Sequence, residues 1–182
     1  MRALIALSRG IDAMTAVIGR AVYWLVLAAI LVSAANATSR KVLSVSSNAW
    51  LELQWYLFGA AYLAAAAYTL QRNEHIRIDI VSNLLPKRVR DWIDVFGHVF
   101  MLAPFTLLMI KETWPSLVES YRLGETSSNF GGLTVWPAKA CILAGFILLL
   151  LQAISELIKR IAIIRGVISD PLAAVAAHAP IE

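Results

Sequence analysis

The sequence AVYWLVLAAILVSAANATS, residues 21–39, contains no charged side chain, and neither does LQWYLFGAAYLAAAAYTLQ, residues 53–71. Charged residues flank both stretches: Arg20 and Arg40 bound the first, and Glu52 and Arg72 bound the second. A helix that rises about 1.5 Å per residue needs about 20 apolar residues to cross a hydrocarbon core about 30 Å thick. Both stretches are therefore predicted to form transmembrane helices.

The composition of the whole chain agrees with a membrane protein. Of its 182 residues, 59% are hydrophobic and 15% are charged, and the mean hydropathy is +0.70. Soluble domains contain about 45–50% apolar and about 25% charged residues. Disordered, collagen-like and disulfide-rich chains are excluded, the last because Cys141 is the single cysteine. The net charge of +4 comes from basic residues spread around the apolar segments, which favours a membrane surface over nucleic acid.

Two shorter uncharged stretches, 95–110 and 140–155, reach spanning length if the helices begin at Trp92 and Trp136. The chain is thus predicted to be an all-α integral membrane protein with four transmembrane helices, in a single membrane domain over residues 1–182. The predicted spans cover about residues 19–39, 50–71, 92–114 and 136–158. All six tryptophans fall near a predicted helix end, where membrane proteins concentrate this residue: Trp24, Trp50, Trp55, Trp92, Trp114 and Trp136.

Lysine and arginine are unequally distributed over the two sides of this arrangement. Eleven lie in the N-terminal segment, the loop between the second and third spans, and the tail: Arg2, Arg9, Arg20, Arg72, Arg77, Lys87, Arg88, Arg90, Lys159, Arg160 and Arg165. Five lie on the other side: Arg40, Lys41, Lys111, Arg122 and Lys139. Because basic residues are enriched in cytoplasmic segments, both chain termini are predicted to lie in the cytoplasm.

A cleavable signal peptide is an alternative for the first span. The motif Ala35-Asn36-Ala37 resembles a cleavage site that follows an apolar stretch with a basic flank. The stretch is longer than the about 7–15 apolar residues of a signal peptide, so a retained helix is preferred.

Further segments are predicted to lie along the membrane surface beside the spans. Residues 1–18 combine apolar and charged residues as an amphipathic interfacial helix does. Pro86 suits the first turn of a second interfacial helix, 87–94, which then turns into the third span. Pro115 is expected to kink or end any extension of that span, and the tail 167–182 is expected to be frayed.

Small residues form stripes on three of the predicted spans, and close helix contacts in lipid are made by such residues. The stripes are Ala29, Ser33 and Ala37; Gly59, Ala60, Ala64 and Ala67; and Ala140, Ala144 and Gly145. Packing within the chain and contact with a partner protein are both open explanations.

The spans carry almost no reactive chemistry. His98 is the one titratable residue well inside a span, and it is predicted to form a hydrogen bond across a helix interface. Haem needs a second ligand at the same depth, whereas His75 falls in a loop and His178 in the tail. The sequence contains no zinc-ligand cluster, phosphate-binding loop or nucleophile–base pair. No cofactor and no enzymatic activity are therefore predicted for this chain.

The run WLELQW at 50–55, then Gly59, then RNEHIRID at 72–79 resembles the small membrane subunit, the Q or DctQ-type subunit, of tripartite ATP-independent periplasmic (TRAP) transporters. In that family an arginine follows the first span, an acidic residue opens the second, and a His-hydrophobic-x-hydrophobic-Asp signature follows it. The matching residues here are Arg40, Glu52, His75 and Asp79. The resemblance covers about residues 20–165, and the segments 127–132 and 136–139 resemble the branch associated with organic acids.

The resemblance implies a chain without a transport site of its own. A large membrane subunit carries the substrate and sodium sites, and a soluble periplasmic binding protein delivers an organic acid. The small subunit braces the large one in the bacterial inner membrane. Two alternatives remain open: the membrane anchor of a redox complex, and a small channel, which would need a polar pore stripe that the spans lack.

Charged and small residues at the span ends are the candidate structural or subunit-interface residues. An ion pair between Arg40 and Glu52 is predicted to fix the first two spans. Arg72 is expected to pair with neighbouring charges or to meet anionic lipid head groups. The remaining interface candidates are Trp55, Gly59, His75 and Asp79.

The loop before the fourth span is the candidate contact for the periplasmic binding protein. Its turn-forming composition predicts an exposed loop. The candidate contact residues are Ser127, Ser128, Asn129, Gly131 and Gly132.

Overall fold

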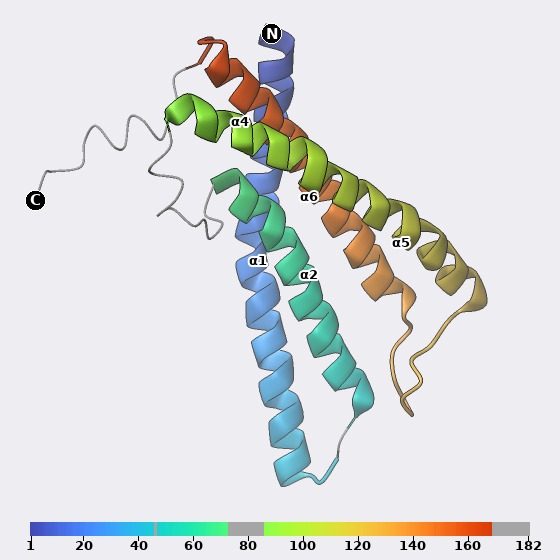
Figure 1. The fold of residues 1–182 in the computed structure, drawn as a ribbon. Helices are drawn as coiled ribbons and strands as arrows, with labels where there is room; N and C mark the ends of the chain where they lie inside the picture. Colours follow the sequence, from blue (N-terminus) through green and yellow to red (C-terminus); the bar gives the residue numbers. More distant parts are fainter. Residues whose placement is uncertain (46, 73–85, 169–182) are drawn as a thin grey trace, which may run out of the picture.

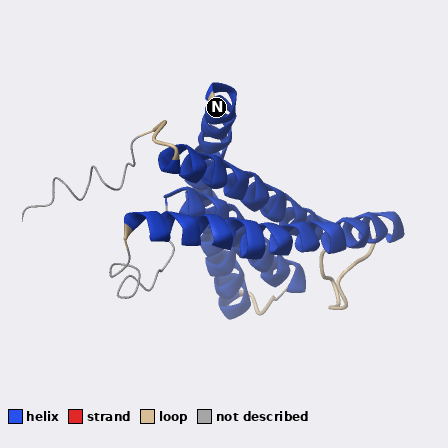
Figure 2. Cartoon of the chain, turned by 45° about the horizontal axis from the view of Figure 1, so that its top comes forward, coloured by secondary structure: helices blue, strands red, loops and turns tan. Residues whose placement is uncertain are grey.

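The computed structural model describes residues 1–45, 47–72 and 86–168 of the chain. Helices account for nearly all of this part (Figure 2), and its one β-type pairing is an isolated bridge between Thr126 and Thr134. The helices are α1 (Arg2–Val42), α2 (Asn48–Arg72), α4 (Lys87–Gly97), the π-helix η1 (His98–Leu102), α5 (Ala103–Leu123) and α6 (Trp136–Ile164). The predicted all-α fold class is confirmed.

The helices are arranged as two antiparallel pairs (Figure 1). α1 packs beside α2, and α5 packs beside α6. The pairs meet through contacts of α6 with both α1 and α2, and they diverge toward the end where α1 finishes and α6 begins. A loop from residue 124 to residue 135 joins α5 to α6 at this open end.

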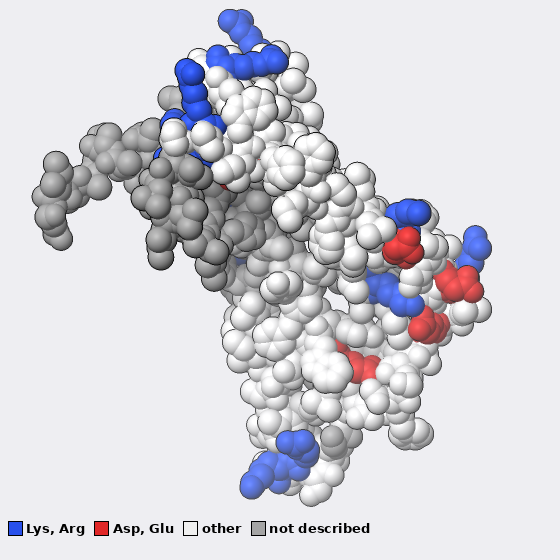
Figure 3. Space-filling view, in the orientation of Figure 1, with Lys and Arg blue, Asp and Glu red and all other residues white. Residues whose placement is uncertain are grey.

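The distribution of side chains is that of a protein surrounded by lipid. Among the described residues, the largest fully buried side chains are polar, and the two largest are Gln152 and Thr15. Large apolar side chains lie outside instead: Trp24 is 72% exposed and Met101 is 70% exposed. Figure 3 shows Lys, Arg, Asp and Glu gathered toward the ends of the molecule, with a largely uncharged surface between them. In water such a surface would aggregate, whereas lipid solvates it.

In the described part of the chain, three continuous helical stretches are long and apolar enough to cross a membrane: Arg2–Val42, Lys87–Leu123 and Trp136–Ile164. Helix α2 does not reach the same hydropathy, because tyrosine, tryptophan and glutamine side chains interrupt its leucines and alanines. The spans predicted at 19–39, 92–114 and 136–158 all lie within these three stretches.

The N-terminal segment differs from its prediction. Residues 1–18 are not a separate interfacial helix, because α1 runs without interruption for 41 residues, about 60 Å at about 1.5 Å per residue. Its buried positions Ser8, Ile11, Thr15 and Gly19 recur every three or four residues and so form one face. That face packs on α6 and α2, so the amphipathic pattern of the segment serves helix packing.

The second predicted interfacial helix is also continuous with a span. Helix α4 passes through η1 into α5 without a turn, and Pro115 lies inside α5 without ending it. The helix ends at Leu123, where Gly124 adopts a left-handed conformation with φ of 60°. The predicted hydrogen bond of His98 across a helix interface is not formed among the described residues, because Nδ1 lies 2.6 Å from the Asp94 carbonyl of the same helix and Nε2 has no hydrogen-bond partner there.

Two glycines explain how closely the helices approach one another. A Cβ on Gly19 of α1 would lie 2.3 Å from Cγ of Tyr68 on α2. A Cβ on Gly145 of α6 would lie 2.6 Å from Cβ of Leu63 on α2. Ala29 and Ala67 are fully buried as well, so part of the predicted small-residue stripes serves packing within the chain.

Candidate functional site

A buried carboxylate at the start of α2 holds the loop between α5 and α6. Glu52 is only 4% exposed, and both of its oxygens accept hydrogen bonds from this loop. Oε1 accepts from the Ser127 hydroxyl and from Asn129 Nδ2 at 2.9 Å, and Oε2 accepts from the Leu133 backbone N–H at 2.6 Å. Three donors on one carboxylate match its acceptor-only chemistry when ionised. We call Glu52, Ser127, Asn129, Gly132 and Leu133 the loop clamp.

Gly132 leaves the space that the carboxylate occupies. A Cβ at this position would lie 2.8 Å from each Glu52 carboxylate oxygen and 2.6 Å from Ser127 Cβ. The neighbouring Gly131 has a φ of 69°, in the left-handed region that glycine favours. Both glycines are therefore required by the path of the loop around the carboxylate.

The loop clamp changes the role predicted for Glu52. No Arg40–Glu52 ion pair is present among the described residues, because the carboxylate is occupied by the loop and Arg40 is exposed. Of the predicted contact residues, Ser127 and Asn129 turn toward Glu52, whereas Ser128 is exposed. Sequence reasoning singled out both Glu52 and the loop but did not bring them together.

Other contacts support the loop at its tip and at its base. On α2, Asn48 Nδ2 donates to the Phe130 carbonyl at 2.9 Å, and the Tyr56 hydroxyl donates to the Thr134 carbonyl at 3.3 Å. At the base, the Val135 N–H donates to the Glu125 carbonyl at 2.9 Å. The loop is thus held along its length against the first turns of α2.

An ion pair at the loop base should make its stability depend on pH. Lys139 Nζ lies 2.7 Å from Glu125 Oε2, and this hydrogen bond holds the pKa of the Glu125 carboxyl below its ordinary value of 4.5. A lowered folded-state pKa stabilises the folded chain above the unfolded value, and the contribution is lost as the pH falls through the folded value. The effect should be small and weaker in high salt, because both side chains are partly exposed.

We expect Glu125→Gln to unfold at nearly the same temperature at pH 3 as the unchanged chain, and slightly lower at pH 6. Thermal unfolding in detergent at several pH values between 3 and 6 measures this difference. A constant difference across that range would show that the carboxylate charge is not responsible.

The interface candidates on α2 lie on a face that nothing in the described chain covers. Trp55 is 66% exposed, Tyr62 is 76% exposed, and a Cβ on Gly59 would meet no atom within 4 Å. At the end of the helix, the Arg72 guanidinium donates to the Tyr68 hydroxyl at 3.1 Å and lies over the ring of that tyrosine. His75 and Asp79 lie outside the described residues.

A second polar cluster, which sequence reasoning missed, joins α1 to α6. The Asp12 carboxylate accepts hydrogen bonds from Gln152 Nε2 at 2.9 Å, Ser155 Oγ at 2.8 Å and Lys159 Nζ at 3.0 Å. Gln71 of α2 donates to the Asp12 carbonyl at 2.8 Å, so three helices meet at this residue. The sequence feature that could have indicated this cluster is the polar row at 152, 155 and 159, whose i, i+3, i+7 spacing places it on one face of the last helix.

An arginine beside this cluster joins α6 to α4. Arg160, which is 9% exposed, places Nη1 3.3 Å from Asp91 Oδ1 and Nη2 3.1 Å from Asp94 Oδ2. Asp91 is 6% exposed. The charges that the sequence places at the ends of the helices are therefore used largely to hold the helices to one another.

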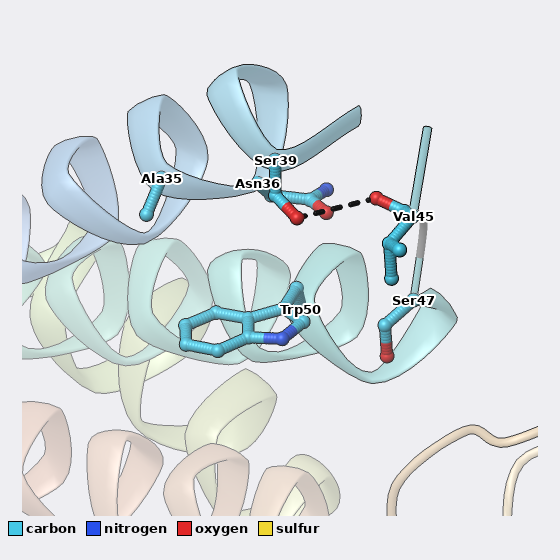
Figure 4. A pocket seen from close by; sticks show the side chains of 6 residues that line it. All are labelled: Ala35, Asn36, Ser39, Val45, Ser47 and Trp50. Atoms are coloured by element: carbon cyan, nitrogen blue, oxygen red, sulfur yellow. Dashed lines mark hydrogen bonds between the residues drawn. The ribbon is translucent and has the colours of Figure 1, made fainter. Parts of the chain in front are cut away.

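A pocket of about 210 Å³ lies between the end of α1 and the start of α2 (Figure 4). Its lining is small, polar or aromatic: Ala35, Asn36, Ser39, Val45, Ser47 and Trp50. One hydrogen bond crosses it, from Ser39 Oγ to the Val45 carbonyl at 3.4 Å. None of the lining residues carries a charge, so the pocket offers no acid–base or metal-binding chemistry. Among the described residues, no three His, Cys, Asp or Glu side chains are placed to share a metal ion.

Comparison with known proteins identifies the family. Residues 29–162 match the family model described as "Tripartite ATP-independent periplasmic transporters, DctQ component". No curated protein and no solved structure matches the chain. The family is a non-enzymatic transport component, and the match favours it over the anchor of a redox complex. With its membrane-length helices, this chain belongs to the DctQ family, the small transmembrane subunit of TRAP transporters.

Proposed function

We propose that this chain is the scaffold subunit of a sodium-coupled TRAP transporter that takes up organic acids across the bacterial inner membrane. It works with a large membrane subunit, which holds the substrate and sodium sites, and with a periplasmic binding protein that delivers the substrate. The main support comes from the contacts that its ionisable side chains make. In the described residues, the buried charges are engaged between helices or with the loop, whereas a transport path uses ionisable groups that are available to an ion or a substrate.

Helix α2 acts as a fourth span in this proposal, and both termini lie in the cytoplasm. Its 25 residues measure about 37 Å at about 1.5 Å per residue, enough for a hydrocarbon core about 30 Å thick. Its alanines pack toward α1 and α6, which compensates for its modest hydropathy. The excess of lysine and arginine puts the α1–α6 polar cluster on the cytoplasmic side and the loop clamp on the periplasmic side.

The two clusters suit a brace rather than a moving part. The cluster around Asp12 fixes α1, α2 and α6 at one end, and the loop clamp fixes α2 to the α5–α6 pair at the other. Buried hydrogen-bonded networks of this kind favour one arrangement of the helices. A subunit held at both ends can support the immobile part of a larger partner while that partner moves.

The open face of α2 is the proposed contact with the large subunit. Gly59 lies between the exposed aromatic side chains of Trp55 and Tyr62, so a partner helix can approach the α2 backbone there. We expect Gly59→Leu to leave the isolated chain folded, because a Cβ at this position meets no atom of the described chain within 4 Å, and to reduce recovery of the large subunit in co-purification several-fold. Gly10→Leu is the control, since a Cβ on Gly10 also meets no atom within 4 Å.

Equal recovery of the large subunit with Gly59→Leu and Gly10→Leu would show that this face of α2 does not contact the large subunit. The thermal unfolding of both purified variants separates a lost contact from a lost fold.

The function as a whole is tested by reconstitution in proteoliposomes. We expect sodium-dependent uptake of an organic acid when this chain, the large subunit and the binding protein are all present, and none when this chain is alone. Transport by this chain alone, or full transport by the other two proteins without it, would contradict the proposal.

A further inference from the structure

The tip of the α5–α6 loop carries a large apolar side chain in an unusual setting. Phe130 is 98% exposed, the highest value among the exposed large hydrophobic residues of the described chain. Its neighbours in sequence are polar or small: Ser128 and Asn129 precede it, and Gly131 follows it. A fully exposed phenylalanine in water forgoes the favourable burial of a large apolar surface, so its position calls for a partner.

The loop holds the backbone that carries this side chain in a fixed place. The backbone carbonyl of Phe130 accepts from Asn48 Nδ2 at 2.9 Å, which ties the tip directly to α2. On either side, Asn129 and Leu133 donate to the Glu52 carboxylate. The tip is therefore pre-organised, and a partner that binds Phe130 does not have to order the loop first.

The position of the loop argues against lipid as the partner. Figure 1 shows the loop extending beyond the last turn of α5 and the first turn of α6. A non-helical backbone is not tolerated in contact with the hydrocarbon core, so the loop stays outside it. The Glu125–Lys139 ion pair at the loop base and the exposed Arg122 nearby agree with a position in water.

We infer that Phe130 is the apolar anchor through which this subunit engages the periplasmic binding protein, entering a pocket on that protein's surface. A central aromatic group beside polar groups is the typical arrangement of an energetically dominant contact, and here the exposed Ser128 supplies a polar group at the tip. The inference rests on the proposed function, because it takes the loop to face the periplasm and the partner to be the binding protein.

The test uses the complete transporter in proteoliposomes and varies the concentration of the binding protein. For Phe130→Ala we expect the half-saturating concentration to rise by about tenfold or more, as for a central aromatic anchor, with the maximal rate nearly unchanged. Phe130→Trp should restore most of the affinity. Leu123→Ala is the matched control, since Leu123 is 71% exposed at the end of α5 but is not held by the clamp.

Three outcomes would overturn the inference. An unchanged half-saturating concentration would show that Phe130 does not contact the binding protein. Loss of the large subunit from the purified Phe130→Ala complex would assign the side chain to that interface instead. An additional blue-shifted indole emission from Phe130→Trp in liposomes without binding protein, after subtraction of the emission of the unchanged chain, would assign this position to lipid. Failure of the unchanged transporter to assemble or to transport would instead contradict the proposed function.

Discussion

Replacing Glu52 by alanine is expected to release the loop between α5 and α6. The substitution removes the acceptor for three donors at once, from Ser127, Asn129 and the Leu133 backbone. A donor left without its partner in a partly buried site loses more than the hydrogen bond itself. The space beside Gly132 also becomes empty, so the hydrogen bonds of Asn48 and Tyr56 are the described contacts left between the loop and α2.

Hydrogen–deuterium exchange of the loop measures this release. In Glu52→Ala we expect amide exchange of Leu133 and its neighbours to accelerate on the order of tenfold or more, because local opening controls exchange in such segments. Helix α6 should keep its protection. In the complete transporter, the same change should raise the half-saturating concentration of the binding protein, by less than Phe130→Ala does, because the tip is then held by Asn48 without the Glu52 carboxylate.

Two control variants separate the effect of the clamp from the loss of any carboxylate and from the loss of charge alone. Glu112→Ala also removes a carboxylate, at the middle of α5, but that side chain is 65% exposed and its Lys111 partner is 4.0 Å away. Glu52→Gln keeps the shape and one acceptor oxygen but removes the charge, so it should fall between the unchanged chain and Glu52→Ala. Unchanged exchange at Leu133 in Glu52→Ala would contradict the clamp.

Arg160→Ala is expected to have the largest effect on stability. The guanidinium bridges Asp91 and Asp94 of α4, and its removal leaves buried carboxylate charge beside an apolar helix contact. Removing one partner of a buried ion pair costs about 3–5 kcal/mol. For a chain of this size, that corresponds to a fall of roughly 6–20 °C in the melting temperature.

Thermal unfolding in detergent, followed by circular dichroism, tests the role of Arg160. Arg122→Ala is the control, because Arg122 is exposed in the last turn of α5. The double variant Asp91→Asn, Arg160→Gln should recover part of the lost stability, because it removes charge from both helices. Equal melting temperatures for Arg160→Ala and Arg122→Ala would show that the bridge contributes little.

Arg160 and Glu52 lie at opposite ends of the helical assembly. Arg160 holds α4 to α6 at the end where the helix pairs converge, and Glu52 holds the loop at the end where they diverge (Figure 1). If both predictions hold, the rigidity of the subunit comes from polar contacts at its ends, while the middle is packed by small residues such as Gly145.

The sequence alone determined the class of this protein and the approximate extent of its helices. Hydropathy is a local property that can be read from the sequence. Charged residues bound the apolar stretches, and these stretches lie within the helices of the structure. The segment predicted at 50–71 forms the helix α2 at Asn48–Arg72, whose crossing of the membrane stays a prediction, and the span predicted at 136–158 begins at Trp136 as α6 does. The family resemblance, carried by short motifs around Glu52, was confirmed by the family match.

Only the tertiary structure decided which polar groups meet. Glu52 was predicted to pair with Arg40, which is close in sequence, but its partners lie 75 to 81 residues away in the loop. Asp12 and Lys159 are 147 residues apart, and the polar row on the last helix does not indicate that Asp12 is its partner. Hydropathy indicates that a charge lies at the end of a helix. The partner of that charge depends on how α1, α2 and α6 pack. Glycines such as Gly19 and Gly145 set that packing, because they allow close contacts between distant segments.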